Sequence, residues 1–168
     1  MIATQHSEAK QINPLARFVT KEAVAKVLKV KPEQIREIRL WPYIIHVVGV
    51  GLSRFVSYAD MPPILGVEQP TLQDCMRWRK RWRSSQHQAP IFWVDFYEGK
   101  FRQSRGVEEL FNWGKLVGKI KHGLSELQVE LLRKSYVVVK EFIVEVHGVS
   151  VAEEKEESDQ NEYSRQIQ

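Results

Sequence analysis

The segment IFWVDFYEGKFRQS, residues 91–104, decides how the second half of the chain folds. Its first eight residues are mostly aromatic or β-branched, and read in alternation they place Phe92, Val94 and Phe96 on one face. Gly99 then supplies turn chemistry, and the residues after it predict a short return strand. We therefore predict a β-hairpin at the centre of the second half.

A helix is predicted immediately before this hairpin, over residues 70–84. Thr71 and Asp74 stand three residues apart at its start, which is the spacing of a capping box. Trp78 and Trp82 recur at helical spacing farther along, so both rings are expected to enter the core.

Two more helices are predicted after the hairpin. Residues 107–121 carry apolar side chains at the i, i+3, i+4 spacing of an amphipathic helix. A second, longer helix begins at the capping-box pair Ser125 and Gln128. Because the run YVVV is β-prone, a strand at 136–146 remains an alternative within this segment.

The first half predicts a helix followed by a β-hairpin. Thr20 is a suitable cap for a helix over 21–29, and the segments YIIHVVGV (43–50) and RFVSY (54–58) are rich in strand formers. Residues 35–40 are ambiguous between helix and strand.

The segment 20–58 weakly resembles a helix-turn-helix followed by a wing, with a second helix starting at Pro32. This resemblance names no family. It implies that Gln34, Arg36 and Arg39 read bases. The alternative that we favour is a helix packed on a meander that starts at Ile35.

The chain is thus predicted to be an α+β protein of two units, 14–63 and 70–150, with flexible termini at 1–13 and 152–168. The unit 70–150 is a basic helix–hairpin–helix–helix unit, and the acidic C-terminal tail is expected to be disordered. The one cysteine, Cys75, excludes an internal disulfide and is expected to pack inertly. The longest segment without charged residues has 14 residues, too few to span a bilayer, so we expect no membrane partner.

Charge is distributed unevenly along the chain. The whole chain carries +4, but residues 152–168 hold six acidic and two basic residues, so the rest carries +8. A basic body attracts polyanions, and in the cytoplasm the commonest polyanion is nucleic acid. We therefore expect DNA or RNA as the partner.

The segment RWRKRWR, residues 77–83, concentrates this charge, because five of its seven residues are basic. Guanidinium groups can bind phosphates with two hydrogen bonds each. The alternative is that these cations only solvate the outer face of the helix. Cations of the return strand and of the next helix are expected to enlarge the patch. The predicted phosphate contacts are Arg77, Arg79, Lys80, Arg81, Arg83, Lys100, Arg102 and Lys115.

A weaker pattern resembles metal-dependent nucleases, in which two carboxylates hold Mg²⁺ and a lysine orients water. Asp60, Asp95, Glu98 and Lys100 would supply these groups, but a plain hairpin turn at Gly99 explains the same residues. We therefore predict no catalytic residues, no metal and no cofactor. The expected function is a non-enzymatic, cytoplasmic nucleic-acid-binding or regulatory accessory protein. A protein-interaction module is the first alternative and a nuclease the second.

Overall fold

A computed structural model describes residues 12–165 of the chain, with side chains described up to residue 147. The helices are α1 (Lys21–Leu28), α2 (Leu72–Arg81), α3 (Phe92–Gln103), α4 (Val107–Ile120) and α5 (Glu126–Arg165), and the strands are β1 (Ile35–Leu40), β2 (Ile45–Gly49) and β3 (Leu52–Val56). The predicted α+β class is confirmed. The predicted flexible segment 1–13 lies almost wholly outside the described residues, and the predicted acidic tail lies outside the described side chains.

The three strands form one antiparallel sheet in the order β1-β2-β3. The ambiguous segment 35–40 is a strand, because β1 pairs with β2 from Ile35 opposite Gly49 to Leu40 opposite Ile45. Pro32–Gln34 is only a short 3-10 turn. The helix-turn-helix interpretation is therefore wrong, and the predicted helix on a meander is confirmed. A second helix here would leave the backbone groups of β2 without their β1 partners.

The predicted hairpin at 91–104 is wrong, because residues 92–103 form the helix α3. Its buried side chains are Trp93, Val94, Phe96, Tyr97 and Phe101. Strand alternation would put the neighbours Trp93 and Val94 on opposite faces, yet both are buried, while Asp95 is exposed. Burial of one helical face in the core has overridden the strand preference of the individual residues.

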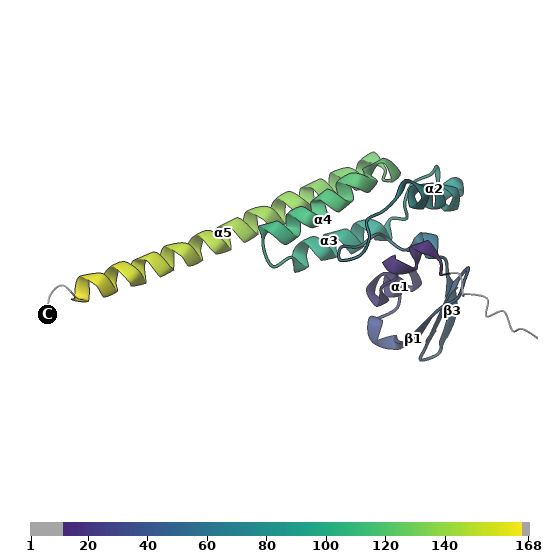
Figure 1. The fold of residues 1–168 in the computed structure, drawn as a ribbon, viewed down its shortest axis with the longest axis horizontal. Helices are drawn as coiled ribbons and strands as arrows, with labels where there is room; N and C mark the ends of the chain where they lie inside the picture. Colours follow the sequence, from purple (N-terminus) through teal and green to yellow (C-terminus); the bar gives the residue numbers. More distant parts are fainter. Residues whose placement is uncertain (1–11, 166–168) are drawn as a thin grey trace, which may run out of the picture.

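Helices α3, α4 and α5 pack side by side, and the sheet with α1 lies at one end of this bundle (Figure 1). Phe101 of α3 meets the Tyr136 ring of α5 edge to face, with 5.5 Å between ring centroids. Gly114 lets α4 approach the same ring, because a Cβ at this position would lie 2.7 Å from Tyr136 Cε2. α5 is helical throughout, so the alternative strand at 136–146 does not form. Within the described residues, no helix combines the length and the apolar character needed to cross a bilayer.

Candidate nucleic-acid interface

The predicted capping box at the start of α2 is confirmed and ties the helix to the first unit. Asp74 N donates to Thr71 Oγ1 at 3.2 Å, and Thr71 N donates to Asp74 Oδ2 at 2.9 Å. The Asp74 side chain is only 1% exposed and forms ion pairs with Arg17, from the 3-10 turn Pro14–Phe18, and with Arg77. Burial alone would raise the pKa of the Asp74 carboxyl, but the hydrogen bonds from Arg17 and Thr71 outweigh it and hold this pKa below its ordinary value.

The two tryptophans of the basic segment are buried, as predicted. The Trp78 and Trp82 rings are nearly parallel, with 6.3 Å between centroids, and the Trp93 ring of α3 stands almost perpendicular to both. Trp93 Nε1 donates to the Asp60 carbonyl at 3.0 Å. Trp78, Trp82 and Trp93 form what we call the buried tryptophan cluster, which fixes α2 on the core and leaves its Arg79 and Lys80 side chains exposed.

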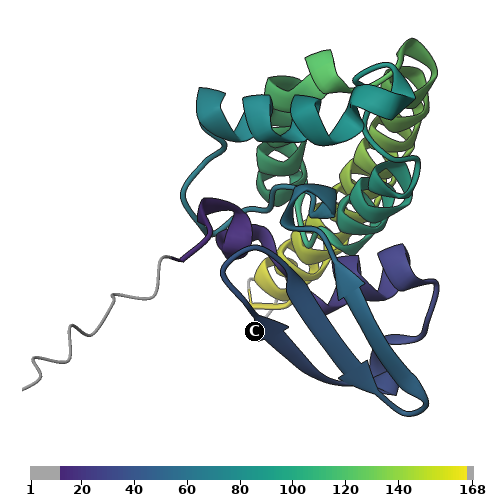
Figure 2. The same cartoon turned by 90° about the vertical axis from the view of Figure 1, so that its right-hand side faces the viewer.

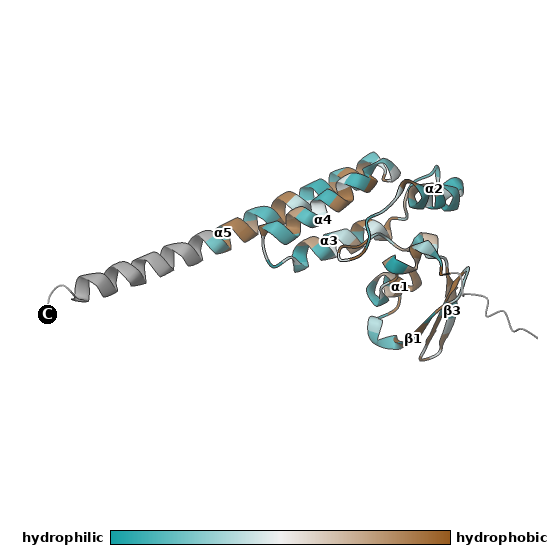
Figure 3. Ribbon diagram, viewed as in Figure 1, coloured by the Kyte–Doolittle hydropathy of each residue, from teal (hydrophilic) through white to brown (hydrophobic). Residues whose placement is uncertain are grey.

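The outward side of α2 bears a basic hollow of about 490 Å³, lined by Met76, Arg77, Arg79, Lys80, Arg83 and His87. Figure 3 shows that α2 is mostly hydrophilic. Arg79, Lys80 and Arg83 are exposed and form no ion pair with any described acidic residue. The hollow therefore presents three cations that are available to an anionic ligand.

A change of backbone direction after α2 places His87 at the edge of this hollow. After α2, the 3-10 turn Trp82–Ser85 is followed by Gln86 and His87, both in the left-handed region with φ of 55° and 60°. The chain thereby turns back, so that His87 Nδ1 lies 3.0 Å from the Arg79 carbonyl oxygen. Basic residues in the last turn of α2 also interact favourably with the negative end of the helix dipole.

Two of the predicted phosphate contacts in the segment 77–83 already have acidic partners. Arg81 bonds to Asp60 over 3.3 and 3.4 Å, which joins α2 to the 3-10 turn Tyr58–Asp60 that follows β3. Arg77 is half-buried beside Asp74, at 3.1 Å. Their charge is partly neutralised within the protein, in contrast to that of Arg79, Lys80 and Arg83.

Lys100 and Arg102 belong to α3 and not to a return strand, and the structure does not bring them to the hollow. Lys100 Nζ lies 2.5 Å from Glu22 Oε2 of α1, and also 5.3 Å from the centroid of the Phe96 ring. Arg102 is exposed near the end of α3. It follows Trp93 by nine residues, which corresponds to about 13 Å along a helix. Lys100 thus links α3 to α1.

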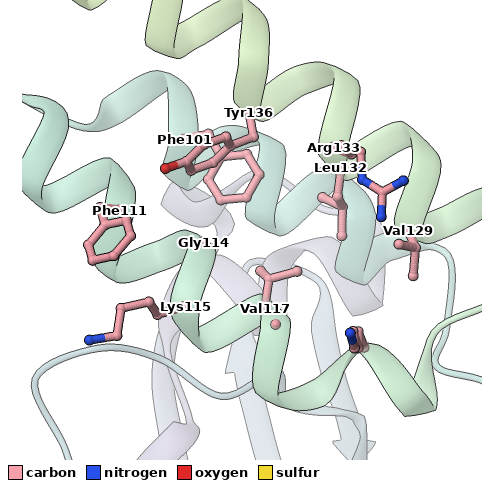
Figure 4. A pocket seen from close by; sticks show the side chains of 11 residues that line it. Phe101, Phe111, Gly114, Lys115, Val117, Val129, Leu132, Arg133 and Tyr136 are labelled. Atoms are coloured by element: carbon pink, nitrogen blue, oxygen red, sulfur yellow. The ribbon is translucent and has the colours of Figure 1, made fainter.

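Lys115 lies beside a different cavity, an apolar cleft of about 340 Å³ lined by residues of α3, α4 and α5 (Figure 4). Phe101, Val117 and Leu132 contribute to its apolar lining. Lys115 Nζ lies 5.4 Å from the centroid of the Phe111 ring. This cleft shares no lining residue with the basic hollow.

The residues of the nuclease pattern do not adopt the arrangement that suggested it. Asp60 accepts from Arg81, Asp95 is exposed, and Glu98 lies within α3, so no strand ends in the Glu-Gly-Lys turn. Among the residues that the structure describes, no group of three His, Cys, Asp or Glu side chains is placed to hold a metal ion.

Sequence reasoning missed a second group of aromatic side chains, which lies on the sheet. Trp41, His46 and Phe55 contact one another, with ring centroids 4.8 to 5.5 Å apart. We call them the exposed aromatic cluster, since Trp41 is 44% and Phe55 55% exposed. The alternation of side chains along the two strands could have predicted that His46 and Phe55 face away from the core. The alternation could not predict the position of Trp41, because this residue comes after the end of β1.

Comparisons with family models, with curated proteins and with solved structures found no match to this chain.

Proposed function

We propose that the protein binds nucleic acid through phosphate contacts made by the outward side of α2. One observation carries the proposal: Arg79, Lys80 and Arg83 line a single hollow without acidic partners among the described residues. They belong to α2 and to the 3-10 turn after it, which the buried tryptophans hold in place. Cations that neutralise phosphates release condensed counterions, and this release is the main source of sequence-independent affinity.

Arginine is well suited to this role. Its planar guanidinium donates two parallel hydrogen bonds to a phosphate and keeps its charge at every physiological pH. The positive charge of the chain outside residues 152–168 would in addition draw a polyanion toward the hollow over a distance of about 8 to 10 Å at physiological salt.

The salt dependence of binding tests the proposal. The full chain and an Arg79→Gln/Lys80→Gln/Arg83→Gln variant are titrated against fluorescein-labelled single-stranded and duplex oligonucleotides of about 20 residues, at several salt concentrations. Each lost phosphate contact lowers the slope of log K against log salt by about 0.7 to 0.9, so we expect a slope shallower by roughly 2 to 3.

The matched control removes the same charge elsewhere. Arg105, Arg133 and Lys140 are exposed cations outside the hollow that form no ion pair with any described acidic residue. Replacing these three with Gln should change the slope by less than about 1, since only long-range attraction is reduced. Equal effects of the two triple variants, or no binding by the unmodified chain at low salt, would contradict the proposal.

A second candidate function, a protein-interaction module, is supported by α5. Val138, Phe142 and Val146 are exposed at successive intervals of four residues and form an apolar stripe. The occupant that we propose is a second copy of the chain, because pairing about a two-fold axis buries the same stripe on both copies. Light scattering over a range of concentrations should show a dimer that Phe142→Lys abolishes. A monomer at every concentration would exclude this contact.

A further inference from the structure

The sheet has one covered face and one open face. Strand alternation turns Ile45, Val47 and Val56 toward the core, where they are buried, and turns His46 and Phe55 the other way. Figure 1 shows α1 on one side of the sheet, and no described helix on the other side. The aromatic residues of the open face are therefore not covered by any described part of the chain.

The exposed aromatic cluster is held in a defined geometry. The His46 and Phe55 rings stack at an interplanar angle of 26°, and the Trp41 ring meets both at 46° and 55°. His46 Nε2 lies 3.0 Å from Ser53 Oγ, which fixes the imidazole. Tyr58 Oη donates to the Trp41 carbonyl at 2.6 Å and holds the backbone of that residue. The rings form a pre-arranged surface whose outer parts face solvent.

The chemistry of this surface matches unpaired bases. Register places Arg39, His46 and Phe55 in one row across the three strands. The Arg39 guanidinium is ion-paired with Glu37 at 2.7 Å, so the two rings are the main stacking groups of this row. Stacking on aromatic rings and on guanidinium planes is how proteins bind the bases of single strands. The next row of this face consists of Glu37, Val48 and Ser53. It offers one aliphatic side chain, whereas an aliphatic partner surface would be expected to meet Leu, Ile and Val.

The sheet and α2, which bears the basic hollow, lie at the same end of the molecule. Figures 1 and 2 show α2 and the sheet at the same end of the molecule, one above the other in the second view. The Arg81–Asp60 ion pair and the Trp93–Asp60 hydrogen bond connect α2 and α3 to the turn directly after β3. A strand of nucleic acid long enough to span this end of the molecule would meet cations at α2 and rings on the sheet.

We propose that the open face of the sheet binds unpaired bases of single-stranded DNA or RNA, which stack on Trp41 and Phe55 while their phosphates contact the hollow at α2. This inference rests on the proposed function and specifies its ligand. In a duplex the bases are already paired and stacked within the helix, so the rings add affinity only for single strands.

Tryptophan fluorescence makes a direct test possible. The chain has five tryptophans, and Trp78, Trp82, Trp93 and Trp113 are all buried, so Trp41 is the exposed one. Binding of an unlabelled oligo(dT) or oligo(U) to the full chain should quench the part of the emission that acrylamide also quenches. Trp41→Phe should lose this quenching but keep its affinity within about threefold, because a ring that can stack remains.

The variants Trp41→Ala and Phe55→Ala should each lower the affinity for a single strand by roughly tenfold, while the duplex affinity and the salt slope stay unchanged because no charge is lost. Thermal unfolding checks that the variants fold. If an alanine variant does not fold, Phe55→Leu serves in its place, since it keeps apolar volume and removes the flat ring.

The possible outcomes separate the two proposals. Binding that depends on Arg79, Lys80 and Arg83 but not on Trp41 and Phe55 overturns the stacking surface and leaves the proposed function standing. Binding that depends only on the rings overturns the phosphate contacts at α2. A change of oligomeric state in the ring variants, with unchanged affinity, shows a protein interface on the sheet. No retention of single strands at low salt overturns both proposals.

Discussion

The buried tryptophan cluster and the exposed aromatic cluster both consist of packed aromatic rings, but they differ in their exposure to solvent. Trp78, Trp82 and Trp93 lie between α2 and α3, each at most 5% exposed. Trp41 and Phe55 pack on each other just as closely but are covered on one side only. The difference teaches that ring packing does not identify a structural core. What surrounds the rings decides whether they stabilise the fold or remain available to a ligand.

The largest expected effect is a difference in the free energy of unfolding between variants of the two clusters. Trp93→Ala should lower the free energy of unfolding by about 3 to 5 kcal/mol, because it removes a large buried ring and leaves a cavity. Trp41→Ala should lower it by no more than about 1 kcal/mol, because that ring is already half in water. Urea denaturation of both variants measures the difference. Equal losses would show that Trp41 also belongs to the core.

The next effect concerns the ion pairs that hold α2 beside the buried cluster. Asp74→Asn should lower stability near pH 7 by about 3 kcal/mol, since it removes one partner of a buried pair. Because the pKa of Asp74 is depressed in the folded chain, its stabilisation is fully present above the ordinary carboxyl pKa and is lost as the pH falls through the depressed value.

Denaturation of the chain and of Asp74→Asn at a series of pH values checks this sign. The stability difference between the two should stay constant from pH 7 to about 5 and shrink below about 4. A difference that grows on acidification would contradict the assignment of Asp74 as a stabilising carboxylate.

A smaller effect probes how tightly the buried cluster is enclosed. A Cβ at Gly123 would lie 2.9 Å from Cζ3 of Trp82, so Gly123→Ala should destabilise by about 1 to 3 kcal/mol through overpacking. Gly118→Ala in α4 is the matched control, since its Cβ would meet nothing within 4 Å. That control should gain up to about 1 kcal/mol from helix propensity. Melting temperatures of the two variants should therefore move in opposite directions.

The smallest expected effect concerns Lys100, which sequence reasoning grouped with the phosphate-binding cations. Because Lys100 and Glu22 are only partly buried, Lys100→Gln should change stability by about 1 kcal/mol or less. It should also leave the salt slope of nucleic-acid binding unchanged, in contrast to the triple variant of the hollow. A shallower slope for Lys100→Gln would extend the interface from α2 to α3.

Local signals determined much of this fold. The capping boxes at Thr71 and Ser125 form as their spacing predicts, because both partners of each bond lie within one helical turn. The helical spacing of Trp78 and Trp82 also predicted their burial, since a stripe of large apolar groups on a helix must find cover. The density of cations at 77–83 is likewise a property of the sequence alone.

Only the tertiary structure decided the features that depend on distant partners. Residues 92–103 carry strand-forming side chains, yet they form α3 because Trp93, Tyr97 and Phe101 can then enter one core together. Lys100 and Arg81 form ion pairs with Glu22 and Asp60, which lie 78 and 21 residues away in the chain. These pairs distinguish them from the cations of the hollow, which have no acidic partner among the described residues. The exposure of Trp41 and Phe55 depends on which face of the sheet α1 covers. Sequence periodicity specifies which side chains share a face, but not which element covers that face, because covering depends on contacts between segments that are remote in the chain.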